Sequence, residues 1–186
     1  MPVQFSKESR AMNATTTMDV TDAVTPFDTR AFRDTCGAFP TGVTVISTLA
    51  ADGRPAGMTA NGFLSVSLDP PLVLVSIGHG ARTHERLMMN ETYAVSVLRH
   101  DQKAIAAHFA RRTDEADPPF DMHNGHAFVP GAVARIGCRI VDRHLAGDHT
   151  LFVGQVETFD STPDVHPLVF ASGQLFSPIN REEFTR

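Results

Sequence analysis

The sequence has few cysteines and no long hydrophobic segment. Only Cys36 and Cys138 occur among its 186 residues, too few for the disulfide framework of a small secreted protein. Its most apolar run, Leu72–Ile77, is far shorter than the ~20 residues that a membrane-spanning helix needs, and residues 1–25 contain no apolar signal-peptide core. The net charge of −5 offers no basic surface for a phosphate backbone. We therefore expect a cytoplasmic protein that binds neither membranes nor nucleic acid.

Motifs for several common chemistries are also missing. No serine lies in a nucleophile elbow, no GxxxxGKS/T loop occurs, and Gly78-His79-Gly80 lacks the third glycine of a dinucleotide fingerprint. Cys36 lies in an amphipathic helical pattern, where a buried cysteine behaves as a small hydrophobic side chain. The histidine pairs are distant in sequence from both cysteines, which is not the spacing of a zinc site. We expect no metal site and no nucleophilic hydrolase.

The composition that remains is that of one globular domain. Hydrophobic residues make up 42% and charged residues 20%, and a chain of this length buries roughly 70% of the surface that its unfolded form exposes. We expect the domain to span residues 26–180, with terminal tails at 1–25 and 181–186.

Short β-branched segments joined by turn signals dominate this domain. Helical spacing is found at Phe27–Phe39, Thr83–Met89 and Asp101–Arg111, whereas Arg112–Pro130 is expected to be a long loop. Strands are predicted at Thr41–Leu49, Pro55–Ala60, Ser65–Leu68, Leu72–Ile77, Tyr93–Leu98, Ala132–Val141, Thr150–Phe159 and Pro167–Phe176. This order predicts a mainly β protein, an antiparallel barrel with a few short helices.

Three segments combine residue types that suit a cofactor site. Gly78–Thr83 connects a predicted buried strand to a helix, and its glycines, Arg82 and helix-start amides suit an anion. Gly57–Phe63 is rich in small and polar residues, which let a flat heterocycle approach backbone groups. Gly147–Gly154 places an acid and an imidazole just before a strand. For each segment, an ordinary loop or turn is the alternative interpretation.

Five motifs in these regions occur together and in a fixed order. They are Phe39-Pro40-Thr41-Gly42-Val43-Thr44-Val45, Gly57-Met58-Thr59-Ala60-Asn61, Leu68-Asp69-Pro70-Pro71-Leu72-Val73, Thr83-His84-Glu85 and Gly147-Asp148-His149-Thr150-Leu151-Phe152-Val153-Gly154. With them, the chain closely resembles the short-chain flavin reductases, the reductase components of two-component flavin monooxygenases. The resemblance extends from about Phe27 to Ile179.

The resemblance implies a fold, a reaction and partners. The fold would be the FMN-binding split β-barrel, as a homodimer with flavin near the subunit interface. The reaction would be reduction of FAD or FMN by NADH or NADPH, followed by release of reduced flavin to a separate oxygenase. Flavin and nicotinamide carry the redox chemistry, so the protein need supply only stacking, orientation and electrostatics. This explains why no acid–base pair or nucleophile is visible in the sequence.

The resemblance also assigns roles to residues. His149, backed by Asp148, would lie over the flavin face and position the nicotinamide; its alternative role is to stabilise the turn. The predicted flavin-binding residues lie along the isoalloxazine edge, at the ribityl phosphate and around them: Thr41, Met58, Thr59, Ala60, Asn61, Gly62, Ser76, Ile77, Gly78, Arg82, Thr83 and Phe109.

Two positions depart from the family pattern. Relatives often carry serine at the position of Gly62 and small hydroxyl residues near Ala81, so Arg82 is expected to compensate through a charged phosphate contact. Two other functions stay open from the residues: a flavin- or haem-binding split-barrel protein without turnover, and an oxidase related to pyridoxamine phosphate oxidase.

Overall fold

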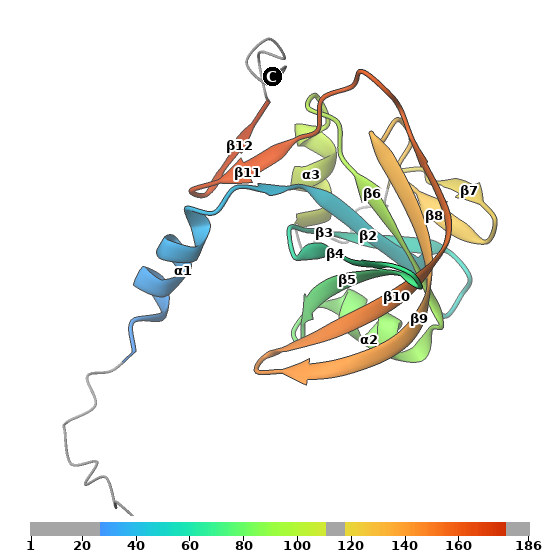
Figure 1. Ribbon diagram of the computed structural model, residues 1–186, viewed down its shortest axis with the longest axis horizontal. Coiled ribbons are helices and arrows are strands. Elements are labelled where there is room, and N and C mark those ends of the chain that lie inside the picture. The colour runs from blue at the N-terminus through green and yellow to red at the C-terminus, as the bar shows by residue number, and fades with distance from the viewer. Residues whose placement is uncertain (1–26, 111–117, 178–186) are drawn as a thin grey trace, which may run out of the picture.

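The computed structural model describes residues 27–110 and 118–177. Seven antiparallel strands form its main sheet, in the order β3-β2-β6-β9-β10-β5-β4 (Figure 1). Their bounds are β2 Thr44–Leu49, β3 Pro55–Ala60, β4 Phe63–Leu68, β5 Pro71–Gly78, β6 Thr92–Val97, β9 Ala134–Ala146 and β10 His149–Ser161. The expected tails at 1–25 and 181–186 lie outside the described residues.

The two edges of this sheet meet at one corner. Strands β3 and β4 lie at opposite edges, yet only Asn61 and Gly62 separate them in the chain. Two residues span only about 7 Å even when extended, so the sheet must curl until its edges approach each other. No ladder joins β3 to β4 in the described part of the chain. The result is a barrel with an open seam, and the predicted split β-barrel is confirmed.

Smaller elements flank the barrel. Strands β1 Thr41–Gly42, β11 Val169–Ala171 and β12 Gln174–Phe176 form a three-stranded sheet, and β7 Asp121–His123 pairs with β8 His126–Phe128. Helix α1 Thr29–Gly37 begins at Asp28, whose carboxylate accepts from the amides of Arg30 and Ala31 at 2.9 and 3.0 Å. Helices α2 Arg82–Met89 and α3 Lys103–Ala110 pack against the barrel.

Two hydrophobic clusters hold these elements together. The first fills the barrel with alternate residues of β5, β6 and β10, together with Leu87 of α2, and includes Val75, Ile77 and Phe152, each fully buried. The second packs Ala106 and Phe109 of α3 against residues of β2 and the smaller sheet. None of the helices in the described ranges is long and apolar enough to cross a membrane.

Three expectations from the sequence were wrong. The described part of the loop expected at Arg112–Pro130 contains the hairpin β7–β8, which turns at Asn124 and Gly125 with positive φ at both. The strand expected at Pro167–Phe176 is instead a hairpin, because Ser172 and Gly173 also take positive φ. Cys36 is exposed rather than buried, since α1 projects from the barrel (Figure 1) and none of its residues is buried.

Candidate functional site

The corner where β3 meets β4 is packed tightly against β5. The backbone amide of Ser76 donates to the carbonyl of Gly62 at 2.8 Å. A Cβ added to Gly62 would lie 3.1 Å from the Ser76 Cβ and 3.2 Å from the Ser76 carbonyl oxygen. A larger residue would push Ser76 away by a few tenths of an ångström. Glycine at position 62 therefore brings the β3–β4 link against the end of β5.

The end of β5 also meets the predicted imidazole. Gly78 and His149 are direct partners in the β5–β10 ladder, and a Cβ on Gly78 would lie 3.5 Å from the His149 Nε2. The His149 Nδ1 is 2.7 Å from the Asp148 Oδ1. This hydrogen bond and the charge of His149 lower the pKa of Asp148, so the carboxylate stays ionised and orients the ring.

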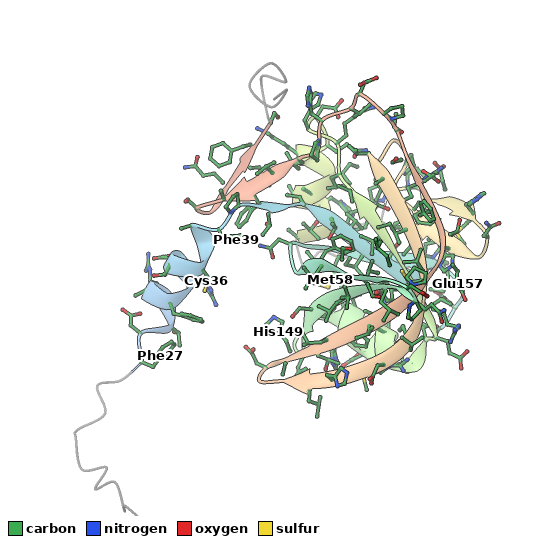
Figure 2. The ribbon with its side chains drawn as sticks, viewed as in Figure 1. Phe27, Cys36, Phe39, Met58, His149 and Glu157 are labelled. Carbon is green, nitrogen blue, oxygen red and sulfur yellow. The ribbon has the colours of Figure 1, made fainter. Side chains whose placement is uncertain are left out.

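These contacts form a continuous line from Gly62 through Ser76 and Gly78 to His149. Figure 2 shows His149 at the tip of the β9–β10 hairpin, on the side of the barrel from which α1 projects. Gly62 and His149 are 87 positions apart in the sequence, and the β4–β5–β10 ladders bring the residues of this line together.

Several other predicted residues turn their side chains toward the core. Met58 and Ala60 pack against the barrel cluster, Ile77 is fully buried, and Thr83 is only 2% exposed. Ile77 and Thr83 can therefore offer a ligand only backbone groups, whereas Met58 and Ala60 are partly buried and keep some side-chain surface. Strand β3 is an edge strand, so its outward-facing backbone groups have no strand partner. The hydrogen-bonding edge of a flat heterocycle needs such groups.

The remaining predicted residues lie in or beside α3 and in the three-stranded sheet. The Thr59 hydroxyl donates to the Ala106 carbonyl at 2.8 Å, and Phe109 is a core residue of the second cluster, 5% exposed. Thr41 Oγ1 is one of two buried side-chain polar atoms without a hydrogen-bond partner in the described residues. An orphaned hydroxyl of this kind suits a polar ligand group, whereas Phe109 contributes packing.

Helix α2 begins directly after the line of contacts. Its N-cap residue, Ala81, makes no side-chain capping hydrogen bond, so the N-cap side chain does not take the place where an anion binds a helix start. Arg82 at the first helical position is exposed. Together with the small residues Gly78 and Gly80, this segment fits the phosphate of a flavin.

Sequence reasoning missed a polar cluster under this segment. The Thr150 hydroxyl lies 2.9 Å from the His84 Nε2 and 3.2 Å from the His79 Nε2. Both Thr150 and His84 fall inside recognised motifs, but residues distant in sequence gave no signal that their side chains meet. The ladder register between β5 and β10 creates this contact.

One cavity among the described residues lies away from this line of contacts. It has a volume of about 410 Å³, is lined by Asn90, Arg139 and Arg143 among others, and contains none of the predicted site residues. Asn90 caps the C-terminal end of α2, opposite Arg82.

In this split β-barrel, the β3–β4 corner, the end of β5 and the start of α2 converge beside a histidine. This is the architecture of a flavin-binding oxidoreductase. Residues 36–178 match the family described as flavin reductase like domain. The chain belongs to this family and is an NAD(P)H-dependent flavin reductase, as the sequence predicts.

Individual relatives agree with this assignment. An NADH-dependent flavin reductase from Rhodococcus sp. is 43% identical over 150 residues, which cover 78% of this chain and 84% of the relative. The solved NADH:FAD oxidoreductase SgcE6 of Streptomyces globisporus C-1027, in complex with NAD and FAD fragments, is 39% identical with a TM-score of 0.74, covering 81% of this chain and 92% of that one. The styrene monooxygenase flavin reductase of Pseudomonas putida S12 is 34% identical with a TM-score of 0.75, covering 80% and 98%.

Proposed function

We propose that this chain reduces FAD or FMN with NADH, as a cytoplasmic homodimer, and delivers the reduced flavin to a separate oxygenase. The contact line from Gly62 through Ser76 and Gly78 to His149 carries the proposal, because it joins the flavin-edge, phosphate and nicotinamide regions. Relatives named as an NADH-dependent reductase and as the flavin reductase of a monooxygenase support the donor and the partner. Both cysteines are free thiols, which suits a reducing compartment.

Different residues would bind the flavin and the nicotinamide. The backbone of β3 and the Asn61–Gly62 link would bind the isoalloxazine edge, with Thr41 supplying a hydroxyl. Arg82 and the first amides of α2 would bind the phosphate. Bound flavin accepts a hydride from the nicotinamide. Backbone amides near Thr59–Gly62 would stabilise the negative charge that develops on the flavin edge, and His149, held by Asp148, would orient the nicotinamide.

The homodimer is supported by apolar surface that the described chain leaves uncovered. Phe27, Phe32 and Phe39 on and beside α1 are 55–74% exposed, and Leu64 and Leu68 on the edge strand β4 are 59% and 91% exposed. Exposed apolar surface of this extent marks an interaction site. A second copy would cover it close to the flavin site, because α1 projects on the side of His149 (Figure 2).

Anaerobic mixing of the protein with NADH and an excess of FAD or FMN tests the proposal. We expect many flavin molecules to lose their oxidised absorbance for each protein molecule, which shows that reduced flavin is released. Reduction limited to one flavin per protein would mean that flavin stays bound. An oxygenase added in air should then hydroxylate its substrate only in the presence of this reductase.

A further inference from the structure

The Thr150 hydroxyl is shared by two imidazoles from different elements. His84 lies on α2 and His79 lies in the β5–α2 loop, and their Nε2 atoms are 2.9 and 3.2 Å from the Thr150 Oγ1. Thr150 itself is only 1% exposed. Three elements therefore meet at a single buried oxygen.

This oxygen can satisfy both rings at once. A hydroxyl has one donor hydrogen and two acceptor lone pairs. It can therefore donate to one Nε2 while accepting from the other, or accept from both, so the Thr150 hydroxyl can serve both rings at the same time. Burial, followed by the nearby His79, lowers the pKa of His84, although Glu85 opposes this shift. The surroundings thus favour the neutral form of the His84 ring.

The same network connects the two halves of the proposed ligand site. Thr150 directly follows His149, and the backbone amide of His79 donates to the Asp148 carbonyl at 2.9 Å. His79 also follows Gly78, the first residue of the segment that leads to Arg82. The ring of His84 is fixed further by edge contact with Phe152, at 5.8 Å between ring centroids.

We propose that Thr150 and His84 are positioning residues. They would hold His149 and the Gly78–Thr83 loop at the relative positions that nicotinamide and flavin need in order to bind at the same time. His84 acts through the Thr150 hydroxyl, which lies within hydrogen-bond distance of both Nε2 atoms, and the His79 and His84 rings also contact each other at 4.9 Å between centroids. The inference rests on the roles proposed for His149 and for the loop. The Thr150–His84 network would support both ligand positions, so nicotinamide and flavin would not bind independently.

Removal of the hydroxyl with its shape retained tests this directly. In Thr150→Val we expect the KM for NADH and the Kd for flavin both to rise about 3- to 10-fold, because the hydroxyl's hydrogen bond to each ring is lost, with kcat within about twofold. Thr150→Ser should restore both constants. Thr48→Val is the matched control, because Thr48 is also a buried strand residue, 5% exposed, whose hydroxyl donates to the Thr92 carbonyl away from the site.

A double-mutant cycle tests whether His84 acts through Thr150. His84→Leu should raise the same two constants as Thr150→Val, and the double variant should be no worse than either single variant, because one network is lost only once. His84→Gln, which retains a polar nitrogen, should be closer to the parent protein. Additive losses, or ligand constants in Thr150→Val equal to those of Thr48→Val, would overturn the inference.

The role of His149 is tested separately. If His149→Ala raises the KM for NADH while Thr150→Val and His84→Leu leave both ligand constants unchanged, the proposed function stands and the shared support is wrong. If His149→Ala has no effect on that KM, the role proposed for His149 is wrong.

Discussion

His149 is the exposed side chain on which the nicotinamide role depends. Its ring is 45% exposed, and Asp148 fixes it from one side while Gly78 leaves room on the other. We expect His149→Ala to raise the KM for NADH about fivefold or more, the cost of about 1 kcal/mol of contact, with flavin Kd within about twofold. Steady-state kinetics and flavin fluorescence titration measure the two constants.

The matched control for this change is His144→Ala. His144 lies on the same hairpin, is 59% exposed and is paired with Asp142 at 2.9 Å, but it lies outside the contact line. Its replacement should leave both constants unchanged. Equal losses of NADH and flavin affinity in His149→Ala would show that the residue supports the whole site rather than the nicotinamide.

Arg82 tests the phosphate assignment. If its guanidinium donates to a flavin phosphate, Arg82→Ala should weaken FMN binding by about 1.5–3 kcal/mol, the range for hydrogen bonds to charged groups. Riboflavin, which has no phosphate, should bind equally to both proteins. Arg54→Ala is the control, because Arg54 is an exposed arginine of the β2–β3 hairpin paired with Asp52. An unchanged FMN dissociation constant would remove Arg82 from the site.

Sequence reasoning located backbone positions better than side-chain directions. It placed Met58, Ala60 and Ile77 at the flavin; in the structure the Ile77 side chain is fully buried in the barrel core, and Met58 and Ala60 are partly buried against that core. A two-residue period predicts that neighbours point to opposite faces, but it does not say which face of a barrel a ligand uses. The polar cluster of His79, His84 and Thr150 was missed for a related reason, because it depends on the register between β5 and β10.

At the scale of elements, tight packing between strands sets which glycines the barrel requires. Gly154 on β10 faces β6 and β9, where an added Cβ would lie 2.7 Å from the Tyr93 Cζ and 2.8 Å from the Cys138 Cβ. Both neighbours are buried, and burial raises the pKa of the Cys138 thiol to about 12. Neither neighbour can move into solvent, so the strands themselves would have to separate.

We therefore expect Gly154→Ala to lower the free energy of unfolding by about 1–3 kcal/mol, the cost of overpacking a core. Gly42→Ala is the control, because Gly42 also lies in a strand but an added Cβ there would meet nothing within 4 Å. Urea unfolding of both variants at one protein concentration measures the difference. Equal stabilities would show that β10 can shift without cost.

The elements that the sequence predicted well are those whose signals are local. The capping Asp28, the Asp52-Gly53 hairpin and the apolar strand β5 all appear where expected. The two missed hairpins turn at Asn124–Gly125 and Ser172–Gly173. Asn124-Gly125 is a local hairpin signal that was overlooked, whereas Ser172-Gly173 resembles ordinary loop composition, and the strands they join have only three residues each. Strand β8 is buried by neighbouring elements, whereas its partner β7 is exposed along its length, and a strand of three residues gives too short a pattern to be recognised in the sequence.

At the scale of the whole molecule, α1 is the helix whose apolar face the described residues leave exposed. It has a well-formed N-cap and an apolar face, with Phe27 and Phe32 in ring contact at 5.3 Å between centroids, yet none of its residues is buried. A short amphipathic helix gains most of its stability from packing. The described residues leave its apolar face uncovered, and in the proposed homodimer the exposed edge strand β4 of a second copy would offer it matching apolar residues.

Phe32→Glu should consequently separate the proposed homodimer into monomers, because a charge at 55% exposed Phe32 would be buried in the interface without a partner. Met122→Glu is the matched control, since Met122 is 53% exposed on β7, far from α1 (Figure 1). Light scattering coupled to gel filtration gives the mass of each variant.

Because α1 projects on the side of His149, the monomeric variant should also bind flavin more weakly. A monomer with unchanged flavin affinity would place the subunit interface away from the site, whereas a parent protein that is already monomeric would leave α1 to a different partner.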